Sequence, residues 1–185
     1  EDGQTLEADR VVRCAGGQSA GLLADLCDLE LCPQTRVLCP IATSPKPARD
    51  LDGARFTCRV SVEHAGEPVF NEVGEVLMRK YGVSGIVVFD ASRYAHPGDP
   101  LSIDLAPEMG EDELHRDLLR RVEAAEASGD VAFARLHLLD GTVQPKVAAH
   151  LMERVCGRDG DRPCDVDRLC GLLKRWEFRV ESLME

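Results

Sequence analysis

A glycine pair that follows an apolar segment is the first feature of this sequence that could contact a ligand. Residues 6–15 contain the apolar pair Val11-Val12 and run directly into Gly16-Gly17. This pattern is typical of a buried strand that ends in a tight turn. Because glycine has no side chain, the backbone of such a turn can pass close to a bound nucleotide. The spacing is not G-x-G-x-x-G, so an ordinary tight turn is the alternative.

A second glycine-rich region lies between apolar segments in the middle of the chain. It comprises residues 74–77 (GEVL) and the run Tyr81, Gly82, Val83, Ser84 and Gly85. The run is interpreted either as a loop that touches a ligand or as a turn that lets two strands cross. A nucleophile elbow requires G-x-S-x-G, whereas Ser84 is followed directly by Gly85, and no histidine is nearby in the sequence. The sequence therefore does not favour a serine hydrolase.

The histidines and carboxylates show no spacing that is typical of a catalytic or metal site. No two histidines are spaced i, i+4 and no H-E-x-x-H motif occurs, which favours surface or packing roles over metal ligation. Asp104 and Glu108 lie where a strand leads into a helix, and acidic residues there stabilise the helix dipole. Paired-acid catalysis is a minor alternative. The histidines in question are His64, His96, His115, His137 and His150.

The eight cysteines contain no Cys-x-x-Cys pair, which zinc ribbons and thioredoxin-type sites need. Cys58 and Cys170 take the places of apolar residues in periodic segments, where a free thiol packs as a small hydrophobe. We therefore expect reduced, mostly buried thiols and no metal. A cysteine-based redox or metal protein is left as an alternative.

Charge and hydropathy exclude several classes of partner. The chain has 33 acidic and 22 basic residues and a net charge of −11, so its surface repels nucleic acid and anionic membranes. It has no apolar run long enough to cross a bilayer, and its first residues lack the features of a signal peptide. The sequence therefore predicts a soluble, cytoplasmic protein.

The first half of the chain has the pattern of a small antiparallel barrel or sandwich. Phe56, Cys58, Val60 and Val62 alternate with polar residues, which predicts a half-buried strand. A hairpin turn is expected at residues 66–67. The preceding stretch, 32–51, is expected to be irregular or to form short edge strands. The further predicted strands are 68–70, 73–78, 86–89 as a central strand, and 101–105.

The second half changes to helical periodicity. Leu114, Leu118, Val122 and Ala125 predict one helix, and two more are predicted after Pro145 and after Pro163. After residue 176 the alternation of apolar residues predicts a strand or an extended linker. A chain with strands at both ends looks like an insertion cut from a larger sheet.

Three motifs, taken together and in order, resemble a known family. Residues 8–17 (ADRVVRCAGG) are similar to its "AD-x-V-V-x-A-T-G-G" strand. Residues 74–77 and 81–85 are similar to its "G-E-L-L-F-T-x-x-G-I-S-G" motif, and residues 103–108 (IDLAPE) continue the likeness. The family comprises the NAD(P)/FAD-dependent oxidoreductases that are aminoacetone oxidase-like or bile-acid reductase-like flavoproteins.

The resemblance implies an α+β chain in which a β-barrel-like domain (33–108) and a helical subdomain (109–176) are inserted into a Rossmann-like FAD domain. Residues 1–32 would be a remnant of that domain, and 177–185 a segment returning to it. Of the family's flavin contacts, Ala15, Gly16 and Gly17 carry over, although the family has threonine where this chain has Ala15, and the turn that follows is shorter here.

The function implied for the full-length parent is hydride transfer between NAD(P)H, FAD and a small organic substrate. The insertion would cover the flavin ring and shape the substrate pocket, with residues 81–85 as the substrate-side loop. The fragment alone is expected to hold no FAD and to be inactive. The alternative is a non-catalytic module that binds another protein.

Overall fold

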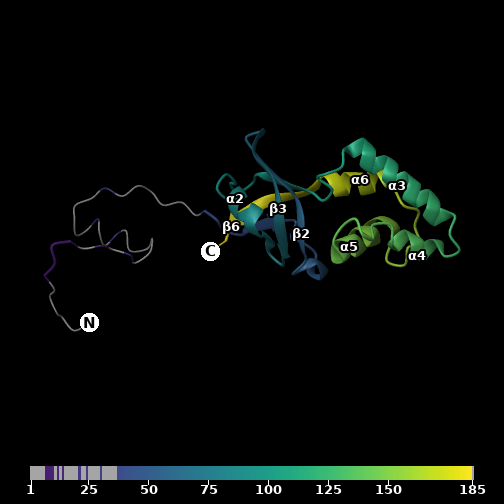
Figure 1. Ribbon diagram of the computed structural model, residues 1–185, viewed down its shortest axis with the longest axis horizontal. Helices are drawn as coiled ribbons and strands as arrows, with labels where there is room; N and C mark the ends of the chain where they lie inside the picture. The colour runs from purple at the N-terminus through teal and green to yellow at the C-terminus, as the bar shows by residue number, and fades with distance from the viewer. Residues whose placement is uncertain are drawn as a thin grey trace. The chain divides into compact units, whose positions relative to one another are not determined.

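The computed structural model describes residues 37–184, together with the earlier positions 7–10, 12, 14, 21, 24 and 30. Residues 36–185 form one compact unit, to which the following description is confined. Figure 1 shows that strands β2, β3 and β6 gather with helix α2 in one part of this unit, and that helices α3 to α6 gather in another.

The strands form a closed antiparallel barrel in the order β1-β4-β3-β2-β5-β6. This confirms the predicted α+β class with a barrel-like unit. The strands of the barrel are β1 (Ile41–Ser44), β2 (Arg55–His64), β3 (Glu67–Arg79), β4 (Gly82–Ser84), β5 (Pro100–Asp104) and β6 (Trp176–Leu183).

The β2–β3 hairpin follows from the alternation read in the sequence. Cys58, Val60 and Val62 are completely buried, and β2 pairs with β3 along its whole length. The chain reverses at Ala65 and Gly66, whose φ values of 52° and 85° are typical of a type I′ hairpin turn. The turn predicted at residues 66–67 is therefore one position too late.

The prediction of a central strand at residues 86–89 was wrong. These residues begin helix α2 (Ile86–Ala91), which packs against β2, β3 and β4. Gly85 takes a φ of 106° at the end of β4 and turns the chain away from the sheet. Val87 then packs on Gly74, where an added Cβ would lie 2.7 Å from the Val87 Cβ. A short apolar run occurs both in buried strands and in buried helices, so the sequence pattern does not distinguish the two.

The three predicted helices are confirmed, and two shorter elements were not predicted. Helix α4 was not predicted, because none of its residues is buried and its sequence therefore has no periodic apolar stripe. A 3-10 helix, η2, follows β1. The bounds of these five helices are η2 (Arg49–Leu51), α3 (Glu111–Glu126), α4 (Val131–Leu136), α5 (Pro145–Cys156) and α6 (Val166–Lys174).

The segment after α6 closes the barrel. Strand β6 pairs with β1 on one side and with β5 on the other. Residues up to Leu183 therefore pair within the barrel. The predicted domain boundaries, including the return segment 177–185, stay predictions. A single hydrophobic core contains barrel residues such as Ile103 and helix residues such as Leu151.

No helix in the described part of the chain is both long enough and apolar enough to cross a membrane.

Candidate functional site at the barrel–helix junction

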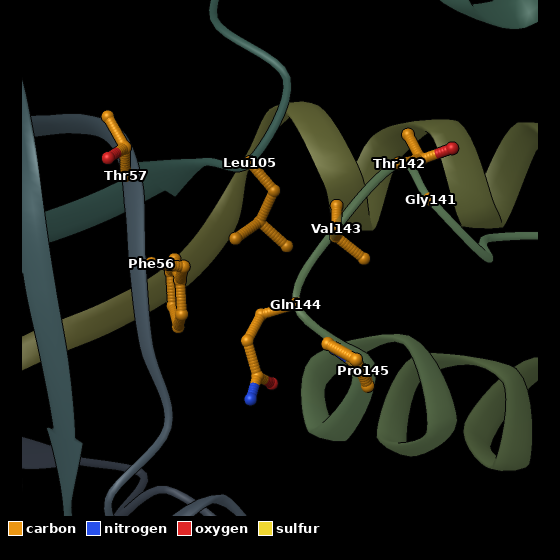
Figure 2. A pocket seen from close by; sticks show the side chains of 8 residues that line it. All are labelled: Phe56, Thr57, Leu105, Gly141, Thr142, Val143, Gln144 and Pro145. Carbon is orange, nitrogen blue, oxygen red and sulfur yellow. The ribbon is translucent and has the colours of Figure 1, made fainter.

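A pocket of about 330 Å³ lies where the barrel meets the helical part. Figure 2 shows that the side chains of Phe56, Leu105 and Val143 surround its middle, with Gln144 below them. Ligand pockets have volumes of about 300–1,000 Å³, so this one is at the small end of that range. Its lining consists of Phe56, Thr57, Leu105, Gly141, Thr142, Val143, Gln144 and Pro145.

Leu105 is placed in the pocket by the way the chain leaves the barrel. It follows the last residue of β5, and its backbone N–H donates to the carbonyl oxygen of Leu173 at 2.7 Å. This hydrogen bond ties the exit of the barrel to helix α6. The Leu105 side chain is buried, with 6% of its surface exposed, and it forms part of the apolar wall.

An ion pair fixes the same junction. The Lys174 ammonium lies 2.7 Å from the Asp104 carboxylate, with exposed side-chain fractions of 17% and 15%. Lys174 also donates to the carbonyl oxygens of Ala106 at 3.0 Å and Met109 at 2.7 Å. Asp104 accepts from the Ala106 N–H at 2.9 Å. Asp104 therefore anchors β5 to α6, which is a structural role rather than the paired-acid one weighed from the sequence.

The helical wall of the pocket is held by the start of helix α5. The Gln144 side-chain oxygen accepts from the Val147 N–H at 3.1 Å and caps the helix. Figure 2 shows this oxygen on the α5 side and the amide nitrogen on the other side. Thr142 accepts from Arg121 at 2.9 Å, and Arg121 is held by Asp117 at 2.7 Å. The loop that carries Val143 is therefore fixed at both ends.

The chemistry of the lining suits binding and orientation rather than acid–base catalysis. None of the lining residues has an ionisable side chain. A positioned general acid or base is the usual means by which protein side chains move protons, and this pocket does not supply one. Hydride chemistry at this site would have to come from a cofactor, with the protein orienting the substrate and excluding water.

The glycine-rich run predicted as a substrate-side loop is built into the barrel. Gly82, Val83 and Ser84 form strand β4, between β1 and β3, and all three are buried. A Cβ on Gly82 would collide with the carbonyl oxygen of Ile41. Tyr81 is part-buried, and its carbonyl oxygen accepts from the Thr43 N–H at 3.0 Å.

The glycines at 82 and 85 thus let backbone segments approach closely. A Cβ on Gly85 would collide with the carbonyl oxygen of Glu75. The run does not line the junction pocket. A substrate-side role for residues 81–85 stays a prediction. The predicted flavin contacts Ala15, Gly16 and Gly17 lie outside the described residues.

None of the described cysteines lines the junction pocket. Cys58 and Cys170 are buried, as predicted from their places in apolar patterns. Burial, with the nearby charge of Asp104, raises the pKa of the Cys58 thiol to about 12, which keeps it protonated and unreactive. The described cysteines are free thiols, namely Cys14, Cys39, Cys58, Cys156, Cys164 and Cys170.

A sequence profile of the family described as the HI0933-like protein barrel and H2TH domain matches residues 37–184. The chain belongs to this family. The family match confirms the resemblance to FAD-dependent oxidoreductases that the motifs predicted. This HI0933-like chain is also similar to the 3-dehydro-bile acid delta(4,6)-reductase of Clostridium scindens, at 28% identity over 123 residues. That match covers 58% of this chain and 30% of the relative, so the chain spans less than a third of the relative's length.

The pocket residues of this HI0933-like domain were missed because none carries a distinctive chemical group. Phe56 was expected only as a core position of its strand, and Pro145 only as a helix start. A polar residue directly before a proline that begins a helix is a capping signal, and Gln144 is such a residue. The approach of β2 to the loop before α5 has no local signal, because it depends on tertiary packing.

Proposed function

We propose that this chain is the substrate-side insertion of an FAD-dependent oxidoreductase. The family match over residues 37–184 carries the proposal, because it spans both the barrel and the helices. The junction pocket supports it, since it is partly apolar and has no acid or base of its own. In the full-length parent, the insertion would cover the flavin ring and shape the space in which the substrate lies.

The lining of the junction pocket fits the ring end of a flavin or its substrate rather than the nucleotide end. Phe56, Leu105 and Val143 offer an apolar wall, whereas the pocket lining has no positive charge to hold a pyrophosphate. When bound, FAD supplies hydride transfer between NAD(P)H and the organic substrate. Nucleotide binding is assigned to the predicted strand that ends at Ala15, Gly16 and Gly17, together with the remainder of the parent.

This chain's own residues would orient the substrate and exclude water. The apolar side chains would pack on a flat or ring-shaped skeleton. The Gln144 amide nitrogen would donate to a substrate oxygen while the amide oxygen keeps its place on α5. The proposed substrate is a small or steroid-like organic molecule, which the name of the Clostridium scindens relative supports. NAD(P)H as hydride donor and a cytoplasmic location are parts of the same proposal. The described cysteines are free thiols, which supports a reducing compartment.

The proposal is tested by filling the pocket in the full-length parent. Val143→Trp should raise the KM for a 3-dehydro bile acid at least about tenfold, because a substrate that binds there loses its space. Flavin content and the rate of flavin reduction by NAD(P)H should not change. Val73→Trp is the matched control, since Val73 lies on β3 with 42% of its surface exposed and lines no part of the pocket. A Val143→Trp protein with the wild-type KM would contradict the proposal.

A further inference from the structure

The barrel brings His64 next to His96 and Asp99, a histidine and an aspartate that lie more than 30 residues further along the chain. His64 is the last residue of β2, and Asp99 directly precedes β5. These strands are antiparallel partners with Val62 opposite Leu101. Continuing that register by two residues places His64 opposite Asp99. His96 enters the same place from the turn just before Asp99.

The Asp99 carboxylate is held in position by the backbone around it. It accepts from the His96 N–H at 2.8 Å, and the Asp99 N–H donates to the His96 carbonyl oxygen at 3.0 Å. The turn is also tied to β6 by two backbone hydrogen bonds. The Gly98 N–H donates to the Val180 carbonyl oxygen at 2.8 Å, and the Val180 N–H donates to the Asp99 backbone carbonyl oxygen at 2.9 Å. Only 9% of the Asp99 side chain is exposed. The carboxylate is therefore a preformed acceptor at the barrel rim.

The two imidazoles converge on this carboxylate. His64 Nδ1 lies 2.9 Å and 3.1 Å from the two Asp99 oxygens, and His96 Nδ1 lies 3.6 Å from Oδ2. The ring centroids of the histidines are 4.3 Å apart. One ligand atom from each residue lies within 4.8 Å of the others. A tetrahedral zinc ion, with bonds of about 2.0–2.2 Å, holds its ligand atoms roughly 3.3–3.6 Å apart. The His96–Asp99 distance of 3.6 Å is at the upper end of that range, and the hydrogen-bonded His64–Asp99 distances of 2.9 Å and 3.1 Å lie a few tenths of an ångström below it.

We propose that His64, His96 and Asp99 form a binding site for a divalent transition-metal ion of the zinc class. Two imidazole nitrogens and one carboxylate oxygen suit zinc, nickel or cobalt, whereas magnesium and calcium prefer a shell of oxygens. The His64 and His96 side chains are 46% and 61% exposed, so solvent reaches the ion and completes the tetrahedron. The site shares no residue with the junction pocket, so it does not depend on the proposed function.

The charge around the site is mixed. Arg179 donates to the Gly98 carbonyl oxygen at 3.0 Å and brings a positive charge to the same turn. The chain as a whole carries a net charge of −11, which attracts cations. The site could not be predicted from the sequence, because its two histidines have none of the short spacings that are typical of metal motifs. The pairing of β2 with β5 brings His64 to the turn that carries His96 and Asp99.

The test is calorimetric titration of the full chain, without a histidine tag, in reducing buffer free of chelators. Zn²⁺ should bind, and His64→Ala and His96→Ala should each weaken this binding more than about tenfold. His115→Ala is the matched control, because His115 pairs with Asp167 at 2.8 Å in an exposed pair outside this cluster. The two histidine variants are chosen over Asp99→Asn because their side chains are exposed and their loss leaves the backbone of the turn intact.

Cobalt distinguishes this site from the cysteines. Co²⁺ bound here should give visible d–d bands that disappear in the His64→Ala, His96→Ala double variant, without a thiolate charge-transfer band. The proposal is overturned if the full chain binds neither ion, if the double variant binds Zn²⁺ as the wild type does, or if thiolate bands dominate the cobalt spectrum.

Discussion

The ammonium group of Lys174 lies 2.7 Å from the carboxylate of Asp104, and this ion pair joins helix α6 to strand β5. The same ammonium donates to two backbone carbonyl oxygens in the segment that leaves the barrel. The pair therefore holds the barrel and the helices in the arrangement that creates the junction pocket.

Lys174→Met should lower the free energy of unfolding by about 2–4 kcal/mol, because the mostly buried carboxylate and the carbonyl oxygens lose their donor. Denaturant unfolding measures the difference. Arg120→Met is the control, since Arg120 is 75% exposed and its ion pair with Asp117 should contribute less than about 1 kcal/mol. If both variants unfold like the wild type, Lys174 does not have this structural role.

The close approach at Gly85 gives a second prediction. Gly85→Ala should destabilise the chain by about 2–4 kcal/mol, because φ is 106° and the new Cβ meets the Glu75 carbonyl oxygen. Gly171→Ala is the matched control. It lies in α6 with nothing within 4 Å of an added Cβ, and it should stabilise the chain by about 0.5–1 kcal/mol. Thermal melts of the two variants should therefore shift in opposite directions; equal shifts would show that the packing at Gly85 is not tight.

The secondary structure could be predicted from the sequence wherever apolar residues recur with the clear period of a strand or of a helix. The alternation from Phe56 to Val62 predicted β2, and the stripe from Leu114 to Ala125 predicted α3. The prediction of a strand at residues 86–89 was wrong, because four consecutive apolar residues fit a central strand as well as a helix that packs on β3. The closing strand β6 was recognised as extended, but its partners β1 and β5 are far away in the sequence.

The candidate site was harder to predict than the fold. The Gly82 and Gly85 positions were identified as special, and their reason turns out to be close backbone packing. The pocket residues Phe56 and Val143 come from distant segments and have no reactive groups. The cluster of His64 with Asp99 depends on the β2–β5 register, which alternation along one strand does not reveal.

The pH dependence of stability should contain a contribution from Asp99. Burial opposes ionisation of this carboxyl, but hydrogen bonds from the His64 ring and the His96 backbone N–H, with the charges of both imidazoles, outweigh it and lower its pKa below 3.8. A carboxyl with a lowered folded-state pKa stabilises the fold above its unfolded-state value and loses this effect as the pH falls through the folded-state value. The difference in unfolding free energy between wild type and Asp99→Asn, measured with chelator present, should thus shrink as the pH falls below about 4. A difference that grows on acidification would contradict this.

The thiol of Cys58 should resist modification in the folded chain. Its pKa of about 12 and its complete burial leave almost no accessible thiolate at pH 8. Mass spectrometry after alkylation should find Cys14, which is exposed, labelled and Cys58 unlabelled until denaturant is added. Rapid labelling of Cys58 under native conditions would show that strand β2 opens easily.

The proposed role as a substrate-side insertion is tested most directly by measuring bound flavin in two purified proteins, the full-length parent and this chain, after incubation with FAD and desalting. We predict about one FAD per parent molecule and none on this chain, because the lining of the junction pocket has no charged group that could hold a pyrophosphate. A colourless parent that instead binds a protein partner tightly, or stoichiometric FAD on this chain alone, would contradict the assignment.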